Sequence, residues 1–388
     1  MGRMGLQAMP LAMLLLACAG GTSNEAQARD SASSKMPFAT AEVADFDQPW
    51  AIEFLPGSGR RLTDLALVTE KSGALWLVDS RDGSKRAVAG APAAKVAGQG
   101  GLGDVVVHPD FAANRRVYIS FVEAGEGGTS GAALGYGTLA LDGQPRIENF
   151  RVIWRQSPKV EGNGHFAHRI AFGPDGFLYV TSGDRQKFDP AQDLGGNLGK
   201  VLRLTAEGAP APGNPWASRG GVAREFYSIG HRNQLGLDFA PDGRLWAVEM
   251  GPKHGDELNL IVAGRNYGWP RVSNGSHYDG RDIPDHKPGD GYEAPKAWWD
   301  PAISPGGMLI YDGAMFKGWR GDALIAGLSG QSLSHVDIEG DRVVARHDFP
   351  MGARIRAVEE GPEGALYVLE DGGRGSGGRL LRLTPTRQ

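Results

Sequence analysis

One local pattern of apolar and turn-forming residues recurs along the chain. An apolar residue is followed by a Pro-Asp-Gly-type turn and then by a short apolar stretch, as in residues 172–180 (FGPDGFLYV). Residues 239–248 (FAPDGRLWAV) and 360–368 (EGPEGALYV) repeat this pattern closely, and looser copies cover residues 54–68, 107–119 and 319–325. Because proline presets the φ angle of the turn and glycine accepts a positive φ, each copy predicts a β-hairpin.

The spacing of the six copies indicates the fold. Successive copies lie about 40 to 80 residues apart, and helical periodicity is weak throughout the chain. A repeated unit of short strands cannot bury its own apolar faces, so such units are expected to stack around an axis. We therefore predict an all-β fold, a six-bladed β-propeller with long functional loops, as one catalytic domain over residues 38–388. A large β-sandwich or a pair of β domains is the alternative.

The composition agrees with many short strands. The chain has 388 residues, of which 59 are glycine and 24 are proline, without a collagen-like period. Such an excess is typical of many tight turns. A hydrophobic content of 41% excludes a disordered chain. The formal net charge of −4 argues against a nucleic-acid-binding protein, which needs a basic patch.

The N-terminal segment has the features of an export signal. Arg3 is followed by a short apolar run at residues 11–17, and residues 26–28 (AQA) form a cleavage motif, so we interpret residues 1–28 as a signal peptide. The single cysteine, Cys18, follows the apolar run as in a lipoprotein signal and is a possible lipid anchor. Residues 29–37 are expected to form a flexible tether. No transmembrane span is expected, and the protein would be periplasmic or secreted, with or without the lipid anchor.

Long, polar, glycine-rich stretches separate the repeats and are expected to gather at the ends of the central channel, where function tends to lie. They cover residues 161–169, 183–200, 230–237, 249–270 and 277–299.

The first two stretches contain a candidate acid–base pair. His165 and His168 precede a predicted strand, but no cysteine or third histidine follows at a familiar zinc spacing. His165 could act as a general base, and Asp184, at the end of the next strand, could fix its tautomer. A loop histidine that only hydrogen-bonds to the backbone is the alternative.

Three further segments carry charge in positions that fit ligands. Arg232 could bind an anion or only brace a turn. Arg354 and Arg356 alternate along a strand, so both guanidinium groups are expected on one face, which favours a polycarboxylate or phosphate ligand. Residues 249–259 form an acidic, kinked, glycine-rich loop whose oxygen atoms suit calcium, although a solvated acidic loop is the alternative.

Taken in order, these segments resemble the glucose/sorbosone dehydrogenase family, the soluble aldose sugar dehydrogenases that use pyrroloquinoline quinone (PQQ). The matching segments are Gln99-Gly-Gly-Leu102, His165 with Arg169, residues 172–176, Gly183-Asp184, residues 198–204, Gly230-His-Arg-Asn233, Gly251-Pro252, Asp256-Glu257-x-Asn259, residues 266–270 and Arg354-Ile-Arg356. They extend over nearly all of the chain from Phe46 onward. The family fold is a six-bladed propeller, as the repeats predict.

The resemblance implies a role for each matching residue. His165 is the general base, Asp184 orients it, and Arg232 lies near the reactive quinone carbonyl. The implied PQQ contacts are Gln99, Arg232, Asn233, Tyr278, Leu328, Ser329, Arg354, Ile355 and Arg356. For calcium, Gly251 and Pro252 contribute backbone carbonyls, and Glu257 and Tyr267 match a further structural calcium site.

The chain also departs from the family pattern at three places. Ala167 and His168 replace a glycine-serine pair and add a second imidazole. Ser329 stands where several members have a cofactor-binding lysine, and Ala357 replaces a common acidic residue. These changes could weaken cofactor affinity or shift the substrate, but they leave the base, the arginines and the calcium loop in place.

The resemblance implies oxidation of aldose sugars at the anomeric carbon to lactones, with PQQ and Ca²⁺ as cofactors and an external electron acceptor. No nucleic-acid partner is expected, and the protein would be a monomer or homodimer. Two other functions remain open: a calcium-dependent propeller hydrolase such as a lactonase, and a propeller that binds a sugar or protein without turnover.

Overall fold

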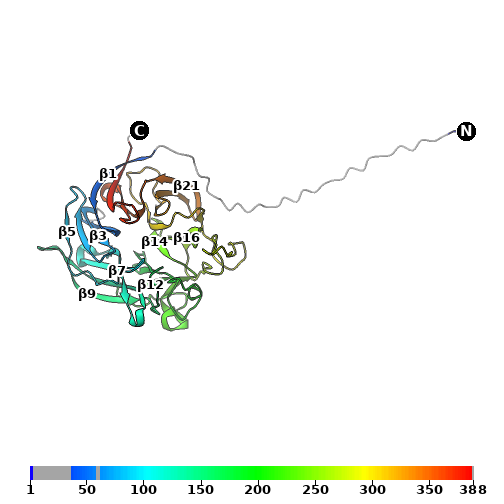
Figure 1. Ribbon diagram of the computed structural model, residues 1–388, viewed down its shortest axis with the longest axis horizontal. Coiled ribbons are helices and arrows are strands. Elements are labelled where there is room, and N and C mark those ends of the chain that lie inside the picture. Colours follow the sequence, from blue (N-terminus) through cyan, green and yellow to red (C-terminus); the bar gives the residue numbers. More distant parts are fainter. Residues whose placement is uncertain (3–35, 58–61, 387–388) are drawn as a thin grey trace.

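In the described residues, six four-stranded antiparallel sheets are arranged around a common axis (Figure 1). The structure is a computed structural model, and it describes residues 1–2, 36–57 and 62–386. The predicted six-bladed β-propeller is therefore confirmed. The predicted signal peptide with Cys18, and most of the predicted tether, lie outside the described residues.

The first strand of each blade lies nearest the axis and contacts the first strands of the neighbouring blades. Blade 1 consists of β2 (Pro49–Pro56), β3 (Leu62–Glu70), β4 (Leu75–Asp79) and β5 (Lys85–Ala87). Blade 2 consists of β6 (Leu102–Val107), β7 (Arg116–Ala124), β8 (Ser130–Ala140) and β9 (Arg146–Arg155). Blade 3 consists of β10 (Ala167–Phe172), β11 (Leu178–Ser182), β12 (Lys200–Leu204) and β13 (Phe226–Ile229). Blade 4 consists of β14 (Gln234–Phe239), β15 (Leu245–Glu249), β16 (Asp256–Ile261) and β17 (Ala297–Trp299). Blade 5 consists of β18 (Pro305–Ile310), β19 (Ala323–Gly327), β20 (Ser332–Glu339) and β21 (Arg342–Pro350). Blade 6 consists of β22 (Ile355–Glu360), β23 (Leu366–Glu370), β24 (Arg379–Pro385) and β1 (Phe38–Asp45).

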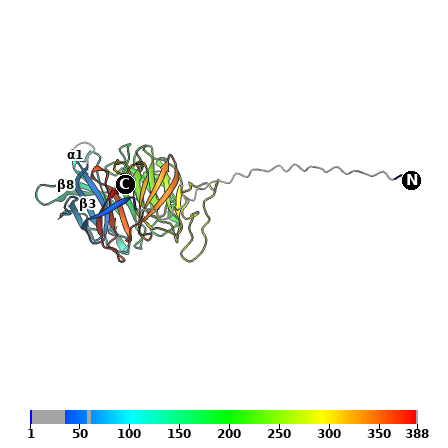
Figure 2. The ribbon, with the colours of Figure 1, turned by 90° about the horizontal axis from the view of Figure 1, so that it is seen from above.

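Helices are short and lie in the connections. They are α1 (Phe111–Asn114) and the 3₁₀ turns η1 (Glu126–Gly128), η2 (Asp189–Ala191), η3 (Ala217–Arg219), η4 (Gly221–Glu225) and η5 (Pro362–Gly364). None of the helices in the described part of the chain has the length and apolar character needed to cross a membrane. The longest connection, residues 262–296 between β16 and β17, projects from the body of the propeller (yellow in Figure 2).

The ring closes through the two ends of the domain. β1 pairs antiparallel with β24, from Phe38 opposite Pro385 to Asp45 opposite Arg379, and so becomes the outermost strand of blade 6. The first and last strands of the chain thus share one sheet, which leaves no unpaired blade at which the ring could open.

Each of the six sequence repeats forms the connection between the first and second strands of one blade. In blade 3, Gly176 has φ +78°, and Asp175 accepts hydrogen bonds from Phe177 N (3.1 Å) and the Tyr179 hydroxyl (2.9 Å). The aspartate therefore braces the turn, and the glycine takes the left-handed conformation that the turn needs.

The apolar core is divided among the interfaces between blades. Six buried clusters each join one blade to the next; the cluster between blades 4 and 5, for example, contains Trp246, Trp299 and Met308. Sheets packed face to face in this way fix the angle between neighbouring blades and hence the positions of the loops at their ends.

A cavity of about 290 Å³ lies among the first strands near the axis and is lined by the carboxyl groups of Glu53, Asp238 and Glu359. Burial raises the pKa of Glu53 to about 8, and the charges of Asp104 and Asp238 add to this effect. Burial likewise raises the pKa of Asp238 to about 7 and lifts the pKa of Glu359 well above its usual value. The folded protein therefore holds protons here that the unfolded chain releases.

Glu53→Gln should stabilise the protein at high pH. Because the folded pKa of Glu53 is raised, its contribution to stability is complete below about pH 4.5 and is lost as the pH rises through about 8. Glutamine keeps an acceptor for Val107 N, which donates to Glu53 Oε1 at 3.0 Å. We expect the variant to gain about 1–2 kcal/mol over the wild type at pH 9 and much less at pH 5. Melting curves at both pH values test this, with the exposed Glu126→Gln as control; a pH-independent difference would contradict it.

Candidate active site

Most of the candidate site residues occupy two recurrent positions, the start of the first strand and the end of the second strand in each blade. These strands are antiparallel neighbours, so both positions lie at the same end of the propeller. In blade 3 they hold His165 and Asp184, just before β10 and just after β11. The other blades contribute Trp50, Lys71, Gln99, Arg232, Asn233, Glu249, Ser304, Leu328, Ser329, Arg354 and Asp371 from equivalent positions.

His165 and Asp184 form a buried pair. His165 Nδ1 lies 2.7 Å from Asp184 Oδ1, and the side chains are 7% and 0% exposed. Asp184 also accepts hydrogen bonds from Gln186 N (2.7 Å) and Trp269 Nε1 (2.8 Å), which fix its carboxylate. Because the carboxylate accepts the Nδ1 proton, His165 Nε2 keeps a free lone pair, as a general base requires.

The pKa values of the pair favour a neutral base beside an ionised acid. Burial lowers the pKa of His165, and the Arg232 charge lowers it further, against the opposing effect of Asp184. Burial by itself would raise the pKa of Asp184, but the hydrogen bond from His165, the charge of Arg232 and the hydrogen bond from Gln186 N hold that pKa below its usual value. The imidazole is thus ready to accept a proton, and the carboxylate can stabilise the resulting cation.

The backbone around this pair is strained. His165, Ala167 and His168 have φ values of +51°, +56° and +59°, and the register of β10 against β11 shifts between Ala167 and Ile170. Non-glycine residues in this region cost on the order of 1 kcal/mol or more each, and a bulge re-aims side chains. Gly183 is required beside them, because a Cβ there would lie 2.1 Å from His165 O.

A cavity of about 400 Å³ adjoins this pair and brings together most of the predicted cofactor residues. Its lining includes the predicted residues Gln99, Asn233, Tyr278, Leu328, Ser329, Arg354 and Arg356. His165 is not part of the lining, but its main-chain N–H donates to Oε1 of the lining residue Gln99 at 2.7 Å. His165 therefore lies directly beside the cavity. Tyr278 is 73% exposed. Ile355 is fully buried in the core between blades 5 and 6, so only its main chain could contact a ligand here.

Two predicted residues offer buried donors without a partner in the described structure. Asn233 is 1% exposed; its Oδ1 accepts a hydrogen bond from Ala167 N (3.2 Å), while its Nδ2 has no partner. Arg232 Nη1 donates to Met250 O (2.9 Å), and its guanidinium lies 5.3 Å from the Trp269 ring, while its Nε has no partner. Unsatisfied buried donors are costly unless a ligand accepts their hydrogen bonds.

The two predicted cavity arginines share a carboxylate that the sequence analysis missed. Arg354 Nε donates to Asp371 Oδ2 (2.9 Å), and Arg356 Nε donates to Asp371 Oδ1 (2.8 Å). Burial opposes ionisation of Asp371, but the charge of Arg356 and the hydrogen bonds of both arginines hold its pKa below the usual value. Asp371 therefore offsets part of the repulsion between the two neighbouring guanidinium groups.

The four predicted metal residues were expected at two calcium sites, but all of them line one small cavity of about 10 Å³, which has room for a single water molecule or ion. They are Gly251, Pro252, Glu257 and Tyr267, and the lining also includes the charged residues Arg232 and Glu249. The Tyr267 hydroxyl donates a hydrogen bond to Leu260 O (2.5 Å) and accepts one from Val262 N (2.9 Å). The phenol oxygen is therefore already engaged in hydrogen bonds within the protein. Only the main-chain carbonyl of Tyr267 could bind a metal.

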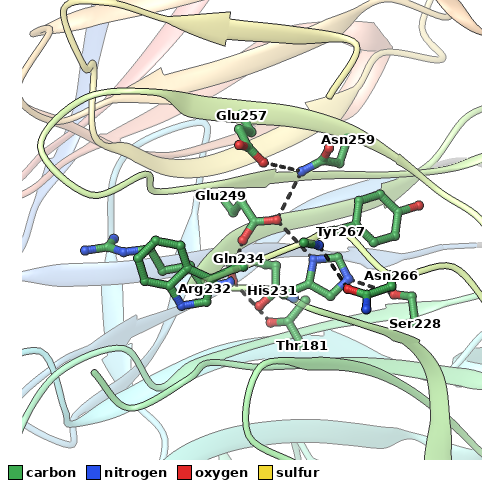
Figure 3. Close-up of polar contacts among 12 residues, drawn as sticks. Thr181, Ser228, His231, Arg232, Gln234, Glu249, Glu257, Asn259, Asn266 and Tyr267 are labelled. Carbon is green, nitrogen blue, oxygen red and sulfur yellow. Dashed lines mark hydrogen bonds and ion pairs between the residues drawn. The ribbon is translucent and has the colours of Figure 1, made fainter. Parts of the chain in front are cut away.

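Glu249, which the sequence analysis did not single out, links this cavity to a buried polar network (Figure 3). Its Oε1 lies 3.0 Å from both His231 Nδ1 and Asn259 Nδ2, and Asn259 Nδ2 also lies 3.2 Å from Glu257 Oε2. Burial raises the pKa of Glu257 well above its usual value, and the charge of Glu249 raises it further. Asn259 Oδ1 is buried with no hydrogen-bond partner in the described structure. Carboxylate oxygens that lie close together and repel each other are suitable ligands for a hard divalent cation.

Glu249 and Asp371, which the sequence analysis missed, share a sequence signal with Asp184, which it predicted. Asp184, Glu249 and Asp371 each follow, by zero to two residues, the second strand of a blade built on a close copy of the Pro-Asp-Gly repeat. An acidic residue at this place in all three copies could have indicated that they meet at one end of the propeller.

His168, the second imidazole in the segment that departs from the family pattern, lines the large cavity and is held there by structural contacts. His168 is 2% exposed, stacks on Trp50 with ring centroids 4.9 Å apart, and is hydrogen-bonded through Nδ1 to Ser120 Oγ (2.8 Å). Burial lowers the pKa of His168 to about 3, so it stays neutral. Gly103 is needed beside it, because a Cβ there would lie 2.0 Å from His168 Cε1.

A different group with metal-binding geometry lies in blade 5. His335 Nε2 is 2.8 Å from Asp322 Oδ2 and 3.3 Å from Asp337 Oδ1. None of these residues lines any of the three cavities described above. Its imidazole also suits a transition metal better than calcium.

The fold and site together define a six-bladed propeller that places the buried His165–Asp184 pair beside a cationic cavity and a small cavity lined by the four predicted metal residues. A family model described as Glucose / Sorbosone dehydrogenase matches residues 46–382, and the chain belongs to this family.

Relatives and solved structures agree with this assignment. The chain is 37% identical over 345 residues to the aldose sugar dehydrogenase YliI of Escherichia coli (strain K12), covering 87% of this chain and 90% of that protein. A crystal structure of a glucose dehydrogenase is 41% identical, with a TM-score of 0.84 over 90% of this chain and all of that one. The PQQ-bound aldose sugar dehydrogenase of Streptomyces coelicolor is 29% identical, with a TM-score of 0.71 over 89% and 98% of the two chains.

Proposed function

We propose that the protein is a PQQ-dependent aldose sugar dehydrogenase that oxidises the anomeric carbon to a lactone and passes electrons to an external acceptor. The observation that carries the proposal is the cationic cavity adjoining the His165–Asp184 pair. Four cationic side chains and one anionic side chain line it, which leaves three net positive charges; they are Lys71, Arg354, Arg356, Arg374 and Asp371.

The residues present fit PQQ. The cofactor carries three carboxylates, which match the three net charges of the cavity, and charge-assisted hydrogen bonds to arginine are strong and directional. The unpartnered Asn233 Nδ2 supplies a donor at the same wall. The PQQ-bound relative supports the same cofactor. Gln99, Tyr278, Leu328 and Ser329 would complete the contacts, with Ile355 limited to its main chain.

The mechanism assigns proton removal to His165. Its Nε2 accepts the proton of the anomeric hydroxyl, and Asp184 stabilises the imidazolium through the 2.7 Å hydrogen bond to Nδ1. PQQ, when bound, supplies the two-electron acceptor for the hydride that leaves the anomeric carbon. Arg232 provides positive charge next to the region where negative charge develops. Loss of the hydroxyl proton and the hydride converts the sugar to its lactone.

We propose calcium for the small cavity. Gly251 and Pro252 would bind the ion through backbone carbonyls, Glu257 through its carboxylate and Tyr267 through its main-chain carbonyl. The repulsion between the buried carboxyl groups of Glu249 and Glu257 supports a bound divalent cation at this place. The cation would hold the loop around Gly251 in position beside Arg232.

Reconstitution tests the whole proposal. Purified apo-protein should reduce a redox dye with a panel of aldoses only when both PQQ and Ca²⁺ are added, and the sugar product should be the lactone. Hydrolysis of lactones with calcium alone would favour the hydrolase, whereas sugar binding without turnover would favour a binding propeller.

We further propose that the protein is exported to the periplasm or secreted. The predicted signal peptide supports export. Cys18 supports a second form of the exported protein, one that is held at the membrane by a lipid anchor. Mass spectrometry of the mature N-terminus separates the two forms. Gel filtration decides between a monomer and a homodimer.

A further inference from the structure

We propose that Lys71 is a cofactor-binding residue of the large cavity, where its ammonium group holds one carboxylate of the tricarboxylate cofactor. This inference rests on the proposed function and deepens it. The sequence analysis gave Lys71 no role and expected that Ser329, in place of a cofactor-binding lysine, could weaken cofactor affinity.

Lys71 occupies one of the recurrent site positions. It directly follows β3, the second strand of blade 1, as Asp371 follows β23 in the neighbouring blade 6. It lines the same cavity as Arg354 and Arg356. Ser329, on the blade 5 side of this cavity, is neutral, and its hydroxyl is engaged with Ala302 O (3.1 Å) and Ser304 Oγ (2.8 Å).

The charges around Lys71 leave its own charge without a counterion. Asp371 is already shared between Arg354 and Arg356, and Lys71 forms no ion pair with any carboxylate in the described structure. Burial lowers the pKa of Lys71, and the Arg356 charge lowers it further, against the effect of Asp371. A half-buried cation next to other cations is unfavourable unless an anion joins them. Arg374, the remaining cation of the cavity, is exposed, so solvent screens its charge more strongly.

The side chain of Lys71 is held in place before any ligand binds. Its Nζ donates to Gly98 O at 2.5 Å, and its main chain bonds to Gln48 O (3.0 Å) and Leu102 N (3.2 Å). Gly101 makes room for it, because a Cβ at that position would lie 2.6 Å from Lys71 Cγ and 2.2 Å from Lys71 O. A preorganised cation loses little conformational entropy when it binds an anion, which favours affinity.

Lys71→Gln is the main test, because glutamine can still donate to Gly98 O but carries no charge. We expect the Kd for PQQ of the purified, calcium-loaded protein to rise about 10–100-fold, the usual weight of one charge-assisted hydrogen bond. Quenching of tryptophan fluorescence on titration with PQQ reports binding without turnover, since Trp50 lines the cavity. The ratio of the two Kd values should shrink as salt is added.

Two further variants separate charge from structure. Lys71→Arg keeps the charge and should bind PQQ within about threefold of the wild type. Lys95→Gln is the matched control, because Lys95 Nζ also bonds to a backbone carbonyl, Gly128 O at 3.3 Å, but lies outside the cavity. Melting curves of all variants exclude loss of fold.

The outcomes are distinct. Wild-type affinity in Lys71→Gln overturns the inference and leaves the proposed function intact. An equal loss in Lys71→Arg and Lys71→Gln also overturns it, because the lysine would then act by positioning the Gly98–Gln99 segment. A wild-type protein that does not bind PQQ overturns the proposed function itself.

Discussion

His165→Ala lowers kcat for aldose oxidation by about 10²–10⁴-fold, while the Kd for PQQ changes little. A general base contributes about this factor, and His165 lies beside the cavity rather than in its lining, so the cofactor contacts remain. Because Asp184 holds the Nδ1 proton, the lost group is the free Nε2. Steady-state kinetics of the reconstituted enzyme and PQQ titration by fluorescence measure the two quantities.

His168→Asn is the matched control for this experiment. Asparagine can keep the hydrogen bond to Ser120, and His168, with its pKa lowered to about 3, is too weak a base to serve at neutral pH. We expect His168→Asn to retain kcat within about tenfold of the wild type. Turnover that survives in His165→Ala and disappears in His168→Asn would reverse the assignment of the two imidazoles.

Removal of the proposed calcium ion abolishes dye reduction and lowers the melting temperature. A metal that binds only the folded state stabilises it by about 3 kcal/mol at a hundredfold excess over its Kd. Without the ion, Glu249 and Glu257 repel each other in a buried site, and the loop around Gly251 loses its fixed position. Thermal unfolding and activity, each measured after chelation and after readdition of calcium, test this expectation.

Two variants, Glu257→Gln and His335→Gln, serve as comparisons for the chelation experiment. Glu257→Gln should reproduce the loss of calcium affinity without chelator, because it removes one charged ligand of the small cavity. His335→Gln, in the separate blade 5 group, should leave the calcium response unchanged. An apo-protein that is indifferent to the chelator would contradict the roles of Gly251, Pro252, Glu257 and Tyr267.

Much of the fold was predictable because its signal is local. A Pro-Asp-Gly turn sets its own φ angles and side-chain hydrogen bonds, as Asp175 and Gly176 do, so each blade carries its own signature. The ordered motifs similarly indicated His165, Asp184 and the arginine pair. The closure of the ring by β1 and β24 has no such local signal, because it pairs residues from opposite ends of the domain.

What the sequence by itself determined was the repeated hairpin, its sixfold count and the chemical types in the loops. Only the tertiary structure decided which charges meet. Asp371 lies between two arginines, Glu249 faces Glu257, and Lys71 joins the cationic cavity from a different blade. Electrostatic effects depend on distance and burial in space, and the ring brings together strand ends that lie more than 300 residues apart in the chain. The pairing of charges in this site is therefore a property of the closed propeller.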